Sequence, residues 1–173
     1  MRAWKVLGAL AAVPLLGAAP SDDGYRAFKQ AMIDAHNDAR DAVGVPPVKW
    51  DDKLADDAQD WADHIARTGR YEHSGWPRGR DPAGEGENML SGIEGLYGYL
   101  DMVGFWVAEK RVFTNRPMPD FSRTGRWQDA GHYAQVVWRA TTRIGCGLSH
   151  AEGQEFLVCR YSPAGNFAGQ RAY

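Results

Sequence analysis

The chain has 173 residues, of which 44% are hydrophobic and 24% are charged, and its formal net charge at pH 7 is -2. This length and composition are typical of a single globular domain with one sizeable core. No basic block provides a surface for phosphate groups, which argues against nucleic acid as a partner.

The first 19 residues have the features of a secretory signal peptide. Arg2 and Lys5 precede the apolar run 6–19, which is too short to span a bilayer and ends in small residues. We therefore expect a signal peptide at 1–19, a single domain at 20–173, and a secreted or periplasmic protein without stable membrane insertion after cleavage. An uncleaved membrane anchor is the alternative.

Apolar residues at helical spacing predict two helices near the start of this domain. The first covers about 25–43, after an N-cap at 21–23. The second covers about 53–69, with Asp51 or Asp52 as its N-cap and Gly69 as its end. A third helix is predicted from about 95 to 115.

Two segments rich in Gly, Pro and Arg separate these elements and are interpreted as long loops. They cover 70–92 and 116–131. Loops of this length inside compact domains are usually functional or disordered. The short apolar segment 132–138 fits a helix or a strand by its pattern, and a helix is favoured.

The end of the chain predicts a β-hairpin. Segments 142–150 and 155–161 read as strands, and the residues between them read as a turn centred on Glu152 and Gly153. In this register Cys146 faces Cys159 as a non-hydrogen-bonded pair, at a spacing that a disulfide tolerates. Two buried free thiols are the alternative. Helices first and paired strands last indicate an α+β fold.

Five histidines are candidates for chemistry. His36 follows the apolar stripe of the first helix and fits a buried, hydrogen-bonded structural role. His64 lies on the polar flank of the second helix, and His150 lies at the hairpin turn, so both are expected to face solvent. His73 and His132 stand in or beside Gly-rich loops, where function concentrates, and are the candidates for a functional site.

Six motifs of this chain, in this order, resemble those of the CAP superfamily, the family of cysteine-rich secretory proteins, antigen 5 and plant pathogenesis-related proteins. They are HNDAR (36–40), HS (73–74), GEN (86–88), WVAE (106–109), GHYAQVVWRAT (131–141) and FLVCRYSPAGNF (156–167). The resemblance implies a three-layer α-β-α sandwich with a small antiparallel sheet. Only two cysteines are present, so the multi-disulfide frameworks of eukaryotic relatives are absent and a bacterial-type secreted member is expected. Ala134 stands where the family more often has Thr or Ser.

The resemblance also implies a cleft lined by His73, Glu87, Glu109 and His132. Two imidazoles with carboxylates behind them predict a weakly held divalent metal such as zinc, ligated by His73 and His132, because protein zinc sites usually have three or four protein ligands. Three alternatives stay open. The tetrad can be a structural His–Glu cluster, the centre of a metal-dependent hydrolase, or part of a protease that uses Ser74.

The expected function is that of a monomeric, non-enzymatic binding module. Fungal and plant relatives imply an apolar ligand, a lipid or a sterol, and fungal sterol-binding relatives carry an aromatic-bearing loop in about the place of segment 115–131. Phe121 and Trp127 of this segment are therefore predicted to contact the ligand. The alternative is that both side chains pack onto the body of the domain.

Overall fold

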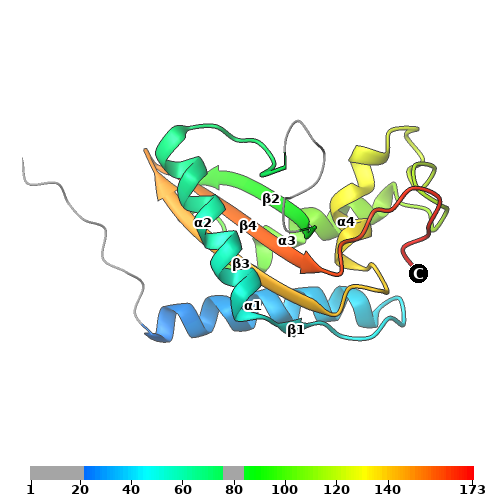
Figure 1. The fold of residues 1–173 in the computed structure, drawn as a ribbon, viewed down its shortest axis with the longest axis horizontal. Coiled ribbons are helices and arrows are strands. Elements are labelled where there is room, and N and C mark those ends of the chain that lie inside the picture. The colour runs from blue at the N-terminus through cyan, green and yellow to red at the C-terminus, as the bar shows by residue number, and fades with distance from the viewer. Residues whose placement is uncertain (1–21, 76–83) are drawn as a thin grey trace, which may run out of the picture.

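The computed structural model describes residues 22–75 and 84–173, and Figure 1 shows their arrangement as helices around a twisted sheet. The α-helices are α1 (Asp22–Asp41), α2 (Asp52–Thr68), α3 (Tyr99–Ala108) and α4 (Gly131–Val136). The strands are β1 (Lys49–Trp50), β2 (Gly86–Ile93), β3 (Arg143–Ala151) and β4 (Gln154–Ser162), and short 3-10 turns cover Glu109–Arg111 and Trp127–Ala130. Among these residues, no helix combines the length and the apolar character needed to cross a membrane.

The four strands form one sheet in the order β1-β3-β4-β2. β3 pairs with β4, and β4 pairs with β2, both antiparallel, whereas the short β1 runs parallel to β3. α2 covers one face of the sheet, and α1, α3 and α4 gather on the other side (Figure 1). The predicted α-β-α sandwich of the α+β class is therefore confirmed.

The two faces of the sheet have different packing. On the α2 face, Met89 and Val158 pack against small and branched residues of the helix. α2 lies so close to β3 that a Cβ atom on Gly145 would clash with the backbone nitrogen of Ala55. On the opposite face a larger core forms, with Trp106 and Tyr161 among its buried side chains. Glycines in β3 thus let the helix and the sheet come into backbone contact.

The helix predictions hold for α1 and α2 within a few residues. The Asp51 carboxylate accepts the backbone N–H of Leu54 at 3.2 Å, and Gly69 ends α2 in a left-handed conformation with φ of 67°. The third predicted helix is too long, because α3 covers only Tyr99–Ala108. Gly95 has φ of 71° and Gly98 is the N-cap, so the chain turns before the helix begins.

The strand β2 corrects the interpretation of segment 70–92 as a loop. The last seven residues of this segment, together with Ile93, form a strand against β4, in a register that pairs Glu87 with Arg160 and Leu90 with Leu157. This correction matters for the site, since it places Glu87 on the sheet, directly opposite Arg160.

The hairpin prediction is confirmed residue by residue. Cys146 lies opposite Cys159, and the two cysteines form a disulfide with Cα atoms 4.1 Å apart. Glu152 and Gly153 form the turn with φ of 53° and 74°, the backbone that a two-residue type I′ hairpin requires. The helix favoured for 132–138 is also present, as α4.

Candidate functional site

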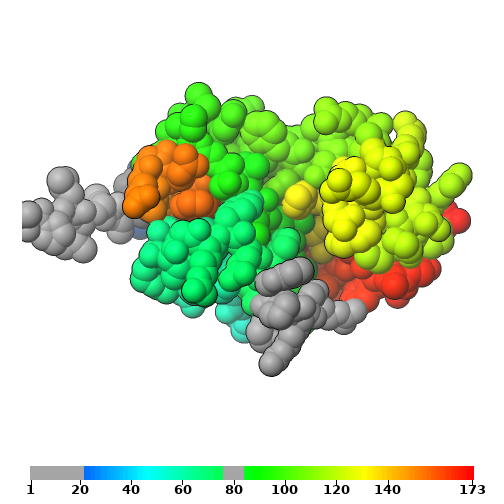
Figure 2. Space-filling view, turned by 90° about the horizontal axis from the view of Figure 1, so that it is seen from above, coloured from blue at the N-terminus to red at the C-terminus, as the bar shows by residue number. Residues whose placement is uncertain are grey.

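A cavity of about 440 Å³ opens beside α4. Its walls come from four parts of the chain: residues 73–75, residues 84–88 at the start of β2, the segment from Met118 to Gln135, and residues 164–167. Figure 2 shows this face of the molecule hollowed between the yellow segment around residue 130 and the green and cyan segments beside it. The cavity collects residues that lie far apart in the sequence.

His132 is held at the start of α4 by Glu109, which follows α3. The His132 ring donates from Nδ1 to Glu109 Oε1 at 2.7 Å. Glu109 Oε2 accepts the backbone N–H groups of His132 at 3.0 Å and of Tyr133 at 3.1 Å. Trp106 stacks near the imidazole, with ring centroids 6.1 Å apart. Backbone donors and an aromatic ring thus determine the position of this histidine.

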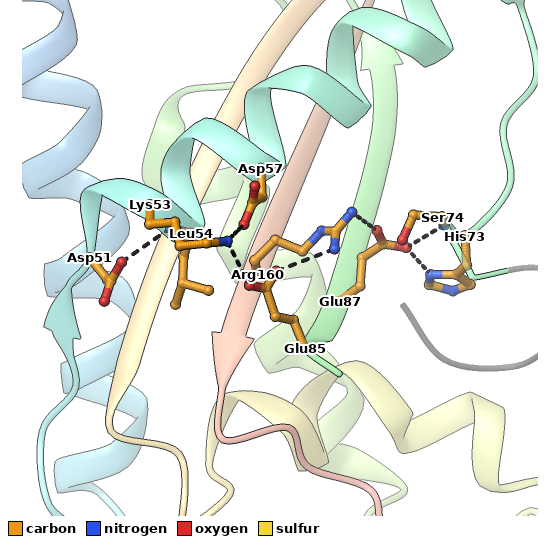
Figure 3. A network of polar contacts seen from close by, with 9 residues as sticks. All are labelled: Asp51, Lys53, Leu54, Asp57, His73, Ser74, Glu85, Glu87 and Arg160. Carbon is orange, nitrogen blue, oxygen red and sulfur yellow. Dashed lines mark hydrogen bonds and ion pairs between the residues drawn. The ribbon is translucent and has the colours of Figure 1, made fainter. Parts of the chain in front are cut away.

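His73 is held by a second carboxylate on the other wall of the cavity. Its ring donates from Nδ1 to Glu87 Oε1 at 2.5 Å, and the same oxygen accepts the backbone N–H of Ser74 at 3.2 Å. The other oxygen of Glu87 lies 3.0 Å from Nη2 of Arg160. Figure 3 shows this line of side chains, from Arg160 through Glu87 to His73. Here a buried cation supports the carboxylate on the side away from the histidine.

Both imidazoles have the same protonation pattern. An ionised carboxylate only accepts hydrogen bonds, so a neutral His73 or His132 carries its proton on Nδ1 and keeps a lone pair on Nε2. Both residues line the cavity. The four residues predicted from sequence are therefore brought together as two His–Glu pairs. His73, Glu87 and His132 line the cavity, whereas Glu109 is outside the lining and contacts His132.

The two imidazole nitrogens of His73 and His132 fit only a weakly bound metal ion. Within residues 22–75 and 84–173, no group of three or more His, Cys, Asp or Glu side chains could hold a metal. The two carboxylates orient the imidazoles through Nδ1 and lie behind them, which is a common arrangement behind metal-ligating histidines. Two nitrogen ligands with solvent fit a weakly held ion and do not fit a structural zinc site.

Apolar side chains also line the cavity, and one sequence prediction about this lining is wrong. Met118, Trp127 and Phe167 belong to the lining. Phe121 is fully buried and packs against Phe113, with ring centroids 5.9 Å apart. The predicted ligand contact of Phe121 is therefore corrected, because its ring fills the core below the loop. Trp127 remains a candidate, and it also packs against the backbone of Gly131.

Three residues of the site were not singled out from sequence. Arg160 is a charged residue in the otherwise apolar segment FLVCRY, and this contrast is the signal that could have found it. Asn88 donates to the carbonyl oxygen of His132 and to the hydroxyl of Tyr161, both at 3.1 Å. Gln135 accepts the backbone N–H of Gly165 at 2.8 Å. These side chains connect the walls of the cavity to the core.

The remaining histidines lie outside the cavity. His36 is fully buried between the Met32 carbonyl and the Tyr161 hydroxyl, as predicted, and burial lowers its pKa to about 4. His64 is only half-exposed, because it stacks on Trp61 with ring centroids 4.5 Å apart. His150 is exposed in β3 beside the hairpin turn.

Comparisons with known proteins show the family of this chain. The family model described as "Cysteine-rich secretory protein family" matches residues 33–161. The chain is 41% identical over 145 residues to a "Pathogenesis-related protein PR-1 type" of Sambucus nigra, covering 83% of this chain and 81% of that protein. It is 36% identical over 146 residues to "Pathogenesis-related protein 1A" of Nicotiana tabacum, covering 84% and 80% of the two chains. These relatives are plant proteins, so the expected bacterial-type membership receives no support.

Solved structures share the fold. The structure of BmVAL-1 matches with a TM-score of 0.70 and 22% identity, over 94% of this chain and 86% of that one. A crystal structure of NaASP2 with Zn2+ matches with a TM-score of 0.68 and 21% identity, over 94% and 90%. With its motifs, its paired His–Glu cavity and these matches, the chain belongs to the cysteine-rich secretory protein (CAP) family.

Proposed function

We propose that this protein is a secreted, non-enzymatic binding module. Its cavity would bind a divalent metal ion weakly at its two imidazoles and an apolar ligand, a lipid or a sterol, against its apolar side chains. The observation that supports this proposal best is the convergence of two carboxylate-oriented imidazoles, His73 and His132, on one cavity. The predicted signal peptide lies outside the described residues, so secretion is part of the proposal.

The two His–Glu pairs support the metal part of the proposal. Nδ1 of each imidazole is engaged by a glutamate, and Nε2 remains as the donor atom for an ion. A bound divalent ion would supply positive charge beside the two imidazoles. The protein's own residues orient the rings, and water would complete the shell of such an ion.

Calorimetry with zinc tests the metal site. Wild-type protein is expected to bind zinc weakly, and His132→Ala is expected to abolish this binding because one of two nitrogen donors is lost. His150→Ala is the matched control, since this exposed histidine does not line the cavity. Unchanged zinc binding in His132→Ala would remove the metal site from the proposal.

The apolar side chains of the lining support the ligand part of the proposal. Trp127 stands in the wall with Met118 and Phe167. Burying one large apolar side chain contributes roughly 1.5–3 kcal/mol, so Trp127→Ala should weaken binding of a sterol or fatty acid by about tenfold or more. Phe105→Ala is the control, because Phe105 is exposed on α3, away from the cavity lining. Native mass spectrometry with these lipids measures the effect, and equal binding by wild type and Trp127→Ala would contradict it.

The alternative function is hydrolysis at the same tetrad. An Nε2 lone pair could act as a general base as well as a ligand. Turnover of ester or peptide substrates that disappears in both His73→Ala and His132→Ala would favour the enzyme over the binding module.

A further inference from the structure

Arg160 occupies an unusual place in the sheet. It lies on β4, directly opposite Glu87 of β2 and Gly145 of β3, and its side chain is only 3% exposed. A buried cation is strongly destabilising unless carboxylates neutralise it. Two carboxylates lie next to the guanidinium, Glu87 at 3.0 Å and Glu85 at 3.4 Å.

The two carboxylates beside Arg160 have different neighbours on their other sides (Figure 3). Glu85 faces Lys53, whose ammonium also pairs with Asp57 of α2. Glu87 faces the segment that carries His73. Arg160 therefore connects the His73 side of the cavity to the body of the domain through Glu87.

The two oxygens of Glu87 divide the contacts between them. Oε1 accepts from Nδ1 of His73 and from the backbone of Ser74, and Oε2 faces the guanidinium of Arg160. The terminal torsion angle of a glutamate has no sharp preferred value. The orientation of the carboxylate plane is therefore fixed by contacts to both of its oxygens. The second oxygen of Glu109 obtains this support from two backbone N–H groups, whereas that of Glu87 obtains it from Arg160.

From this geometry we infer that Arg160 is the positioning residue of the His73 half of the site. By attracting one oxygen of Glu87, it directs the other oxygen at His73, which keeps the imidazole proton on Nδ1 and Nε2 available to the cavity. This inference rests on the proposed function and deepens it, because it names the residue that makes His73 a competent ligand.

The substitution Glu87→Gln makes the inference testable. The introduced glutamine would have one oxygen and one NH2 group, and Arg160 is only a donor. The charged guanidinium should attract the amide oxygen and turn the NH2 group toward His73. His73 would then accept at Nδ1 and carry its proton on Nε2, which removes the lone pair from the cavity.

The experiment combines Glu87→Gln with changes at Arg160. Nitrogen-15 NMR of the imidazoles reports which ring nitrogen carries the proton, and calorimetry with zinc reports the ligand function. Glu87→Gln is expected to move the His73 proton to Nε2 and to weaken zinc binding about tenfold or more, the usual effect of losing a residue behind a metal ligand. The double variant Glu87→Gln, Arg160→Met is expected to return the proton to Nδ1 and to recover zinc binding, because the amide oxygen is released toward His73.

Arg143→Met in the Glu87→Gln background is the matched control. Arg143 is an exposed arginine at the start of β3, and its guanidinium pairs with Asp51 at 2.8 Å, away from the His73 side of the cavity. This double variant should keep the Nε2–H form. The His132 signals should stay unchanged in every variant, since Glu109 holds that ring.

Three results would overturn the inference: a His73 proton that stays on Nδ1 in Glu87→Gln, a double variant with Arg160→Met that behaves like Glu87→Gln, or equal rescue by Arg143→Met. If the variant with Arg160→Met does not fold, Arg160→Gln is used in its place. The amide oxygen introduced at position 160 can then accept a hydrogen bond from the NH2 group introduced by Glu87→Gln. If wild-type protein binds no zinc, the metal part of the proposed function fails, while the NMR result still decides the role of Arg160.

Discussion

Lowering the pH from 7 to 4 should destabilise this protein through His36. The ring of His36 is buried on α1, where Nδ1–H donates to the Met32 carbonyl at 2.7 Å and Nε2 accepts from the Tyr161 hydroxyl at 2.9 Å. Asn88 donates to the same hydroxyl at 3.1 Å. This chain of bonds is complete only while His36 is neutral. Burial, and after it the charge of Arg40, lowers the pKa of His36 from 6.5 to about 4.

The sign and size of the effect follow from this shift. The unfolded chain binds a proton at His36 below about pH 6.5, whereas the folded protein binds it only below about pH 4. Unfolding therefore takes up a proton between these two values. The free energy of unfolding falls as the pH falls through this window. A shift of this size corresponds to a loss of about 3 kcal/mol between pH 7 and pH 4. Below pH 4 the folded protein also takes up the proton, so the further loss of stability through His36 is small.

Urea denaturation followed by tryptophan fluorescence, in steps from pH 7 to pH 4, measures the free energy of unfolding. His36→Gln is the comparison, because glutamine cannot titrate and other groups contribute equally to both proteins. The wild type should lose about 3 kcal/mol more than the variant over this range. Equal losses in the two proteins, or an NMR titration in which His36 becomes protonated near pH 6.5, would refute the reasoning.

Three further changes test the framework of the fold by urea denaturation. Reduction of the Cys146–Cys159 disulfide, which closes a loop with a sequence separation of 13, should lower the free energy of unfolding by about 3 kcal/mol. A decrease of less than about 1 kcal/mol would contradict this prediction. Gly145→Ala should cost at least about 2 kcal/mol, because its Cβ would meet the backbone of α2, whereas Gly104→Ala, in open space within α3, should be neutral or stabilising. Arg40→Lys should cost about 3 kcal/mol, since one ammonium cannot replace the four bonds that the buried guanidinium donates to carbonyl oxygens; a loss below about 1 kcal/mol would show that these bonds are dispensable.

Local patterns in the sequence determined a large part of this structure. The apolar spacing of α1 and α2 and the caps of α2 act within a few residues, so both helices could be predicted closely. The turn at Glu152 and Gly153 sets the hairpin register, and this register places Cys146 opposite Cys159. The tetrad was found through motifs, and the fold brings it together as two His–Glu pairs.

Only the tertiary structure decided the remaining features, because they depend on contacts between distant segments. β2 contributes residues to the cores on both faces of the sheet, so its sequence shows no clear alternation of polar and apolar side chains, and it becomes a strand only beside β4. Phe121 stands in a segment without a period, and its burial depends on Phe113 across the loop. In the sequence, Arg160 is the one charged residue of the segment FLVCRY. Its partner Glu87 lies 73 residues earlier in the chain, and only the pairing of β2 with β4 brings the two charges together and directs Glu87 at His73.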